Sequence, residues 1–314
     1  MITGDKKLHD LFPSDGYPYH VWIDTAGIIR NISGGYNTTA EHVQNFLAGK
    51  NIVLKNPTQK KMNIETFLAD HKLKTLVSSS TISLCSDEWN PGGANGEPLR
   101  NGTLVRLARH CSSILDLFIA AYTENGKYNF YTDYSLKFEA ENVYPYIIPA
   151  DKNLYDDWLQ KHAFTYELIL PASRKAEMFK IMQQDLQSHF DLKAEIRITK
   201  VPAIILRRLR HSVLNLLAKE TLNETFRYRS DMSDSSYYFL NYPVEKFVDY
   251  LMGWVSYHYP FFNELNETGN LDICIREKSV DPFNIDYLNQ DLLKHGLTLT
   301  IEQREIPVLY ISNK

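Results

Sequence analysis

Thiol chemistry is the first to consider, because the chain contains three cysteines, Cys85, Cys111 and Cys274. They lie far apart in the sequence, and none belongs to a Cys-x-x-Cys pair or to a Cys/His spacing typical of zinc sites. His110 is adjacent to Cys111, but neighbouring side chains on a helix or strand point apart, which argues against a catalytic dyad. We therefore expect free, mostly buried thiols at all three positions.

Histidines and glycines provide the other candidate groups. His189 and His295 occupy matching places at the ends of two predicted helices, where the helix dipole favours a partly protonated imidazole. Neither has a carboxylate or cysteine at ligand spacing, so a structural role is favoured over a paired metal site. The glycine-rich residues 90–96 lack the Lys-Ser/Thr and the helix start of a phosphate-binding loop, which indicates a plain loop. The sequence thus offers no catalytic constellation, and we expect no metal and no cofactor.

The elements that would position a site begin with a hairpin near the N-terminus. Two β-prone runs, at residues 20–23 and 27–32, flank a turn and predict this hairpin. Thr38 or Thr39 can cap the helix that is predicted over residues 41–47, where apolar side chains recur at helical spacing.

Pro18 stands directly before this hairpin and opens the pattern Pro-x-x-x-Trp-Ile-Asp-x-x-Gly-x-Ile. Together with the lead-in at residues 8–13, the pattern resembles the proline loop, last two strands and last helix of thioredoxin-like proteins. The resemblance is to the TlpA-type thiol–disulfide reductases, in a form carried by Bacteroidetes members. It implies that Tyr17 and Pro18 form a substrate-positioning loop with a cis peptide bond. The alternative is an ordinary trans proline that opens an edge strand.

The half of the family's site that carries the cysteines has no counterpart here. Thiol–disulfide exchange needs a thiolate and normally a second cysteine that resolves the mixed disulfide. The family carries both upstream of the proline, whereas only seventeen residues precede Pro18. Cys85 and Cys111 lie downstream of the matching segment, so the family's catalytic role is not transferred to them. The resemblance therefore implies a truncated or non-catalytic TlpA-like protein, one that is not an enzyme as the chain stands.

The remaining chain predicts a polar linker over residues 57–74 and an α/β domain over residues 75–314. An internal repeat covers about 165–210 and 270–313. Each copy predicts a strand, a helix, a strand, a turn and a last strand, which opens at Pro202 or Pro307. This half resembles the uncharacterised C-terminal domain that is fused to TlpA-type redoxins and known from soil-associated bacterial proteins, a resemblance that implies no known chemistry.

The predicted fold class is α+β. Residues 1–56 would form a partial thioredoxin-like fold, a hairpin plus a helix, and the following domain would hold two βαββ repeats. Other elements are predicted in this second domain. They are a strand within 74–84, a serine-capped helix over 112–122, a β-like aromatic run over 128–134 that packs in the core, and a helix over 244–254.

Composition narrows the function classes. The net charge of the 314 residues is −4, and the strongest basic cluster, residues 207–210, indicates a solvated strand end or helix start, so nucleic-acid binding is not expected. No apolar run reaches the roughly 18 residues of a membrane-spanning helix. The first residues do not form a signal peptide, which predicts a cytoplasmic protein if Met1 is the true start, and a periplasmic or cell-envelope protein if an upstream signal was lost.

Two other functions stay open. The chain could be a non-enzymatic binding or scaffold module whose repeat domain recognises an unknown partner, such as another protein or the missing N-terminal redox half. The least supported alternative is an enzyme with a site in the C-terminal half, because no acid, base or nucleophile group converges there in the sequence.

Overall fold

The computed structural model describes residues 19–34, 38–50, 52, 76–85, 93–99, 102–209, 224–229 and 235–314. Its fold is α+β with several sheets. The chain divides into two compact units, Met1–Asn125 with Ala140–Asp191 and Gly126–Glu139 with Leu192–Lys314. Residues 75–314, for which the sequence predicts a single domain, are thus shared between the two units. The predicted linker over 57–74 lies outside the described residues.

The hairpin and helix near the N-terminus form where the sequence predicts them. The elements are β1 (Tyr19–Ile23), β2 (Ile29–Gly34) and α2 (Ala40–Leu47), and the two strands pair antiparallel. Thr39 caps the helix because its hydroxyl oxygen accepts a hydrogen bond from the backbone N–H of His42 at 3.2 Å. The rings of Trp22 and Phe46 meet edge to face, with centroids 5.3 Å apart, and so join the helix to the hairpin. A hairpin with one helix occurs in many folds, so it does not by itself identify a thioredoxin-like domain.

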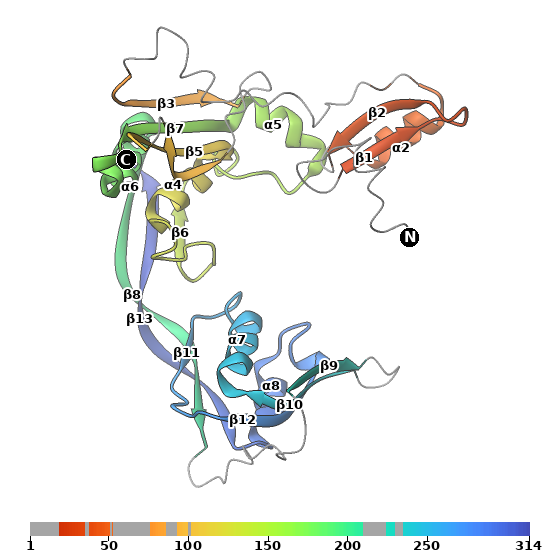
Figure 1. Ribbon diagram of the computed structural model, residues 1–314, viewed down its shortest axis with the longest axis vertical. Coiled ribbons are helices and arrows are strands. Elements are labelled where there is room, and N and C mark those ends of the chain that lie inside the picture. The colour runs from red at the N-terminus through yellow and green to blue at the C-terminus, as the bar shows by residue number, and fades with distance from the viewer. Residues whose placement is uncertain are drawn as a thin grey trace. The chain divides into compact units, whose positions relative to one another are not determined.

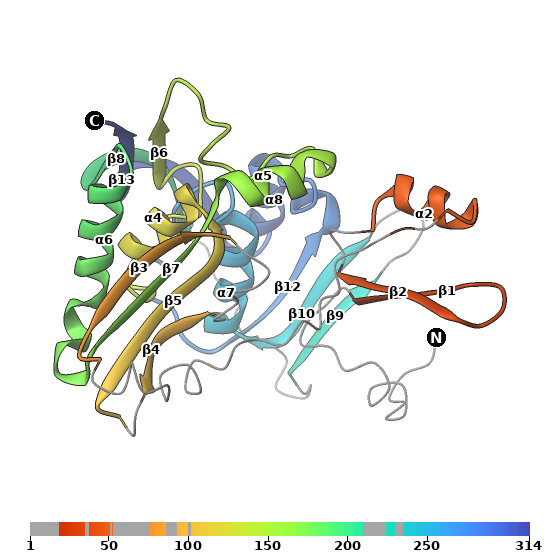
Figure 2. The ribbon, with the colours of Figure 1, turned by 90° about the horizontal axis from the view of Figure 1, so that it is seen from above.

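The first unit also contains an antiparallel sheet with strand order β3-β7-β5-β4. Its strands are β3 (Ser79–Leu84), β4 (Ala94–Leu99), β5 (Leu104–Ser113) and β7 (Ala163–Pro171). The helices are α4 (Ile114–Thr123), α5 (Tyr155–His162) and α6 (Met178–His189), with 3₁₀ turns η2 (Lys152–Leu154) and η3 (Ala172–Glu177). Figure 2 shows α4 and α6 on one face of this sheet. Phe118, Trp158 and Met182 are fully buried between the helices and the strands.

The second unit contains two sheets, with strand orders β12-β10-β9 and β11-β8-β13-β6. The strands are β6 (Leu136–Glu139), β8 (Leu192–Arg208), β9 (Thr225–Arg229), β10 (Ser236–Pro243), β11 (Phe261–Asn263), β12 (Asn270–Arg276) and β13 (Leu297–Asn313). The helices are α7 (Val244–Val255) and α8 (Ile285–Leu293), with a 3₁₀ turn η4 (Glu277–Ser279). Its core forms around Phe239, Phe247 and Leu288, which are fully buried.

The prediction of two βαββ repeats is wrong in one respect: the turn predicted before the last strand of each copy is absent. β8 and β13 are each a single strand of 17 residues. They pair antiparallel from end to end, and Figure 1 shows them side by side over their full length. Pro202 and Pro307 therefore lie inside these strands and do not open them.

The direction of the backbone N–H groups explains how the ribbon tolerates two prolines. In an antiparallel pair, alternate residues direct their N–H away from the partner strand. Ile204 and Leu309 do so, since each donates its N–H to a backbone oxygen outside the β8–β13 ribbon. Pro202 and Pro307 lie two residues before them and share that orientation. The N–H that each proline lacks would thus have pointed to the outer side of the ribbon.

This geometry predicts opposite results for two adjacent substitutions. Ala203→Pro removes an N–H that faces Glu302 on the partner strand, and we expect the free energy of unfolding to fall by about 2 kcal/mol or more. Pro202→Ala removes no ladder bond, and we expect a change of less than about 1 kcal/mol. Urea denaturation of the two variants measures both. Equal losses of stability would contradict the assigned register.

The order of elements in the first half of this region recurs in the second half, and it begins earlier than the sequence repeat. The order β4, β5, α4, β6, β7, η3, α6, β8 is matched by β9, β10, α7, β11, β12, η4, α8, β13, and η2 and α5 are additions to the first copy. Pairing recurs as well: β5 lies between β4 and β7, and β10 lies between β9 and β12. The short strands exchange partners, since β6 pairs parallel with β13 and β11 pairs parallel with β8.

Several smaller predictions can be compared with the structure. The helices predicted over 112–122 and 244–254 are present as α4 and α7, and a strand within 74–84 is present as β3. The aromatic run over 128–134 is not a strand, because β6 begins only at Leu136; Phe130 in this run is buried, whereas Tyr131 is 63% exposed. The plain loop predicted over 90–96 is also wrong in part, since β4 begins at Ala94. No helix among the described residues is both long and apolar enough to span a membrane.

Candidate functional site

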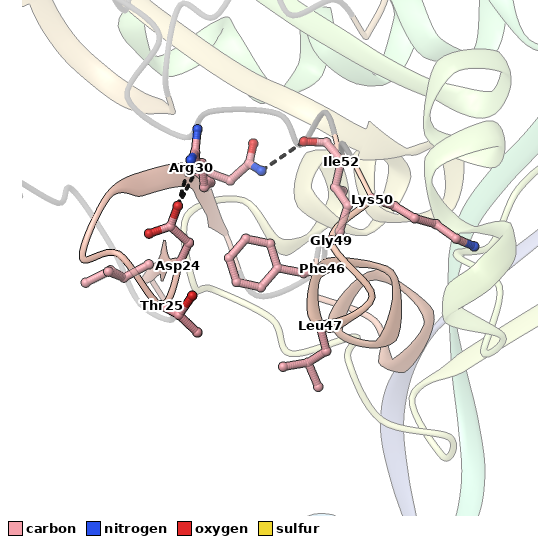
Figure 3. A pocket seen from close by; sticks show the side chains of 10 residues that line it. Asp24, Thr25, Arg30, Phe46, Leu47, Gly49, Lys50 and Ile52 are labelled. Carbon is pink, nitrogen blue, oxygen red and sulfur yellow. Dashed lines mark hydrogen bonds and ion pairs between the residues drawn. The ribbon is translucent and has the colours of Figure 1, made fainter.

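The loop that the family resemblance marks as substrate-positioning, Tyr17 and Pro18, lies outside the described residues. The described part of the same segment forms a shallow pocket between the hairpin turn and the end of α2, shown in Figure 3. Asp24 organises the turn: its carboxylate accepts hydrogen bonds from the N–H groups of Ala26 and Ile28, each at 2.9 Å, and pairs with Arg30. These bonds, led by the one from Ile28, hold the pKa of Asp24 below its usual value. The carboxylate of Asp24 is thus engaged in shaping the turn.

The structure corrects the prediction of three free thiols. Cys85 and Cys111 form a disulfide, with 4.8 Å between their Cα atoms, and both residues are half-buried. Cys85 directly follows β3, and Cys111 lies in β5. Since β3 and β5 pair with opposite edges of β7, the disulfide connects two strands that are not paired with each other. Cys274 in β12 is half-buried and has a free thiol.

A β-bulge explains why the expected separation of His110 and Cys111 fails. In the pairing of β5 with β7, Arg109 is opposite Tyr166 and Ser112 is opposite Phe164, so the two residues between them face Thr165 alone. Cys111 has a φ of 45°, in the left-handed region that few residues other than glycine and asparagine adopt. Side-chain alternation is interrupted there, and the side chains of His110 and Cys111 reach the same neighbourhood.

The imidazole of His110 contacts the disulfide directly. Its Nε2 lies 3.2 Å from the Sγ of Cys111, and its Nδ1 lies 3.2 Å from the Oγ1 of Thr165. Thr165 also accepts a hydrogen bond from the backbone N–H of Cys111 at 3.3 Å. One threonine thus contacts both the bulge backbone and the imidazole, and we name Cys85, Cys111, His110 and Thr165 the disulfide–histidine site.

Three of these side chains are also potential metal ligands. The two sulfurs and an imidazole nitrogen lie within 4.8 Å of one another, and thiolate and imidazole are ligands that zinc prefers. Zinc binds the thiolate form, however, and neither sulfur is a thiolate while the disulfide is formed. The oxidised site is therefore suited to exchange chemistry and not to metal binding.

The second repeat contains the same bulge with different side chains. Leu240 and Asn241 oppose Asp272 there, and Asn241 has a φ of 48°. The backbone N–H of Asn241 donates to the Asp272 carboxylate at 2.6 Å, which matches the bond from Cys111 to Thr165. The sequence signal that we missed is this correspondence: a repeat traced back as far as β5 would have aligned His110 and Cys111 with Leu240 and Asn241.

The histidines at matching helix ends lie in different units, and each has its own surroundings. His189 is the last residue of α6 and makes an edge-to-face contact with Phe190. His295 lies two residues beyond the end of α8, and burial, together with nearby Lys294, lowers its pKa. The expected partly protonated imidazole at the helix dipole is therefore wrong for His295, because desolvation disfavours its charged form.

Two acids at matching places on α6 and α8 have structural partners. Asp185 accepts a hydrogen bond from the Tyr166 hydroxyl at 2.8 Å and another from Ser80. Asp291, whose side chain is 1% exposed, accepts bonds from Arg276 and Ser279 and pairs with Lys294. Each acid fastens its helix to neighbouring elements of its own unit.

Comparison with known proteins adds no relative to this picture. No family model matches the chain, and neither the curated proteins nor the solved structures contain a significant match to it. The functional argument therefore depends on the chain's own residues.

Proposed function

We propose that this chain is a non-catalytic relative of the TlpA-type thiol–disulfide reductases, in which the thioredoxin-like segment is retained without its own exchange chemistry. The observation that carries the proposal is the location of the cysteines. The hairpin and helix that resemble the family adopt the expected structure, yet the first cysteine in the sequence is Cys85, downstream of them. A thioredoxin-type site requires a thiolate beside the proline loop, and this segment supplies none.

A reductase assay tests this function. The full chain is added to insulin and dithiothreitol, and the precipitation of reduced insulin is followed with and without it. We expect the rate to equal that of dithiothreitol alone, whereas a thioredoxin with a Cys-x-x-Cys pair accelerates it. An acceleration by the full chain would overturn the proposal, and the variant Cys85→Ser would then show whether the disulfide–histidine site is responsible.

The cell envelope is the compartment that we propose for the chain. Disulfides form and persist in oxidising compartments and are rare in the cytosol, so the Cys85–Cys111 pair supports the envelope over the cytoplasm. To test this, cells are quenched with acid, the free thiols are blocked with an alkylating reagent, and the mass of the protein is measured by mass spectrometry. We expect one blocked thiol, that of Cys274. Three blocked thiols would indicate a reducing compartment.

A binding module is the second candidate, and one observation favours it. Aromatic side chains gather around the sheet edge formed by β9, where Phe226 is 38% and Tyr228 is 45% exposed, and they contact Tyr237 and Tyr250. Exposed aromatic groups of this kind are enriched in protein interfaces. A photo-crosslinking residue in place of Tyr228 is expected to capture a protein partner in envelope extract. Equal capture from Tyr131, a more exposed control position, would argue against this surface.

A further inference from the structure

The bulge in β5 does not require the residues that it contains. In the second repeat the same bulge, with the same left-handed backbone and the same N–H bond to the opposite strand, is made by Asn241 beside Leu240. Asparagine adopts this backbone more readily than cysteine does. The fold thus accounts for the bulge, while the thiol and the imidazole in the first repeat have to be explained by something other than backbone geometry.

The disulfide lies at a strand end. Both of its cysteines are half-buried and not enclosed in the core. Cys85 sits at the end of β3, where its backbone N–H donates to the carbonyl oxygen of Ala163 at 2.8 Å. Disulfide exchange requires approach of a thiolate to one sulfur, and a partly exposed disulfide at a strand end allows that approach.

Thr165 determines how His110 faces the sulfur. The Thr165 oxygen accepts the N–H of Cys111 with one lone pair and has a second lone pair for the Nδ1–H of a protonated His110. A protonated His110 held in this way also carries a proton on Nε2, the nitrogen that lies 3.2 Å from the Sγ of Cys111. A proton donor at that distance from the Cys111 sulfur lowers the cost of releasing Cys111 as the leaving group.

We propose that the disulfide–histidine site is a thiol-exchange site that accepts two electrons from an external dithiol. A thiolate of the dithiol attacks the Sγ of Cys85, the Cys85–Cys111 bond breaks, and the Cys111 sulfur leaves with the electron pair while a protonated His110 donates its Nε2 proton to it and becomes a neutral imidazole. The second thiol of the reductant then attacks the mixed disulfide, releasing Cys85 as a thiolate and closing the reductant to a disulfide. The dithiol releases two protons to solvent; Cys85 takes up one from solvent, and Cys111 takes up one from His110, which solvent then protonates again.

This site goes beyond the proposed function, because it makes the chain an electron acceptor and not a reductase. The full oxidised chain is mixed with dithiothreitol at neutral pH, quenched with a maleimide at set times, and the labelled cysteines are located by mass spectrometry. We expect Cys85 and Cys111 to be labelled while the chain stays folded, and His110→Ala to slow this reduction about tenfold or more. His189→Ala is the matched control, an exposed histidine at a helix end, and it should leave the rate unchanged.

A monothiol identifies the attacked sulfur. With 2-mercaptoethanol as the reductant, the trapped mixed disulfide should lie on Cys85, because Cys111 has the imidazole beside it and is the better leaving group. Adducts found chiefly on Cys111 would overturn the assignment of His110. Reduction only in urea, at the rate of global unfolding, would overturn the whole site and indicate a disulfide that serves stability alone.

Two further variants keep the test decisive if His110→Ala does not fold. Thr165→Val retains the imidazole but removes its hydroxyl partner, and we expect slower reduction with an unchanged fold. Cys111→Asn copies the residue of the second repeat, and circular dichroism should show a folded chain. An unfolded Cys111→Asn chain would contradict the proposal, because the disulfide would then be required for the fold. The insulin assay is independent: its failure affects the proposed function and leaves this site intact.

Discussion

Replacing Glu167 with alanine is expected to lower the free energy of unfolding by about 3–5 kcal/mol, because the buried guanidinium of Arg106 loses the carboxylate with which it pairs. Glu167 in β7 pairs with Arg106 in β5 at 2.7 Å, and their side chains are only 8% and 3% exposed. The pair lies inside the four-stranded sheet of the first unit, so the loss should appear there. Urea denaturation, combined with hydrogen exchange of the β5 and β7 amides, measures the size and the location of the effect.

Two variants control this result. Replacing both partners, as in Arg106→Met with Glu167→Leu, should recover most of the loss, because a buried ion pair often contributes no more than apolar side chains of similar volume. Lys161→Ala breaks an exposed pair with Asp157, and no measurable change is expected. If Glu167→Ala behaved like Lys161→Ala, the Arg106–Glu167 pair would have to be solvated.

Replacing Asp291 with asparagine should have the second largest effect, and its size should depend on pH. Burial raises the pKa of Asp291, but hydrogen bonds from Arg276, Lys294 and Ser279 together lower it by more, so the net pKa lies below the usual value. We expect Asp291→Asn to cost about 2–3 kcal/mol at pH 7, because Arg276 loses a charged partner that is itself buried.

The direction of the pH dependence follows from linkage. The folded chain holds Asp291 ionised at pH values where the unfolded chain, with an aspartate pKa of about 3.9, already binds a proton. The stabilisation is therefore present above about pH 5 and is lost as the pH falls below 4 through the pKa of the folded chain. The difference between wild type and Asp291→Asn should shrink over that window. A difference that stays constant from pH 7 to pH 3 would contradict the role of the carboxylate charge.

Local structure could be predicted from this sequence where short-range signals agree. The N-terminal hairpin, the helix capped by Thr39, and the helices α4 and α7 were identified by β-branched runs, capping residues and helical spacing. The residues that give these signals are separated by about one helical turn or lie in one hairpin, so the signals can be recognised in the sequence without knowledge of the fold. The thioredoxin-like assignment of residues 1–56 stays a prediction.

The errors share a physical origin in long-range pairing. Pro202 and Pro307 indicate strand starts only if both sides of the strand carry hydrogen bonds. The sequence does not reveal that, among the described strands, none pairs with the outer side of the ribbon at these two residues. Likewise the Cys85–Cys111 disulfide depends on a bulge in β5, which changes the direction in which the Cys111 side chain points. The alternation of apolar and polar residues around the bulge does not indicate it. The sequence predicted no candidate site there because its members are joined by pairing across β7.

The β8–β13 ribbon has a consequence for how such a chain could have arisen. Pro202 pairs with Gln303, while Pro307, the equivalent residue of the other repeat, pairs with Ile198, so the pairing is symmetric about Lys200 opposite Glu305. Each strand is therefore complementary to a copy of itself, the property of an isologous interface. A shorter chain with a single repeat would form a homodimer by pairing this strand with the same strand of a second molecule. Joining the two subunits of such a homodimer end to end gives the arrangement of β8 and β13. Two joined halves are free to differ in sequence, and the cysteine and histidine are present in only one of the two bulges.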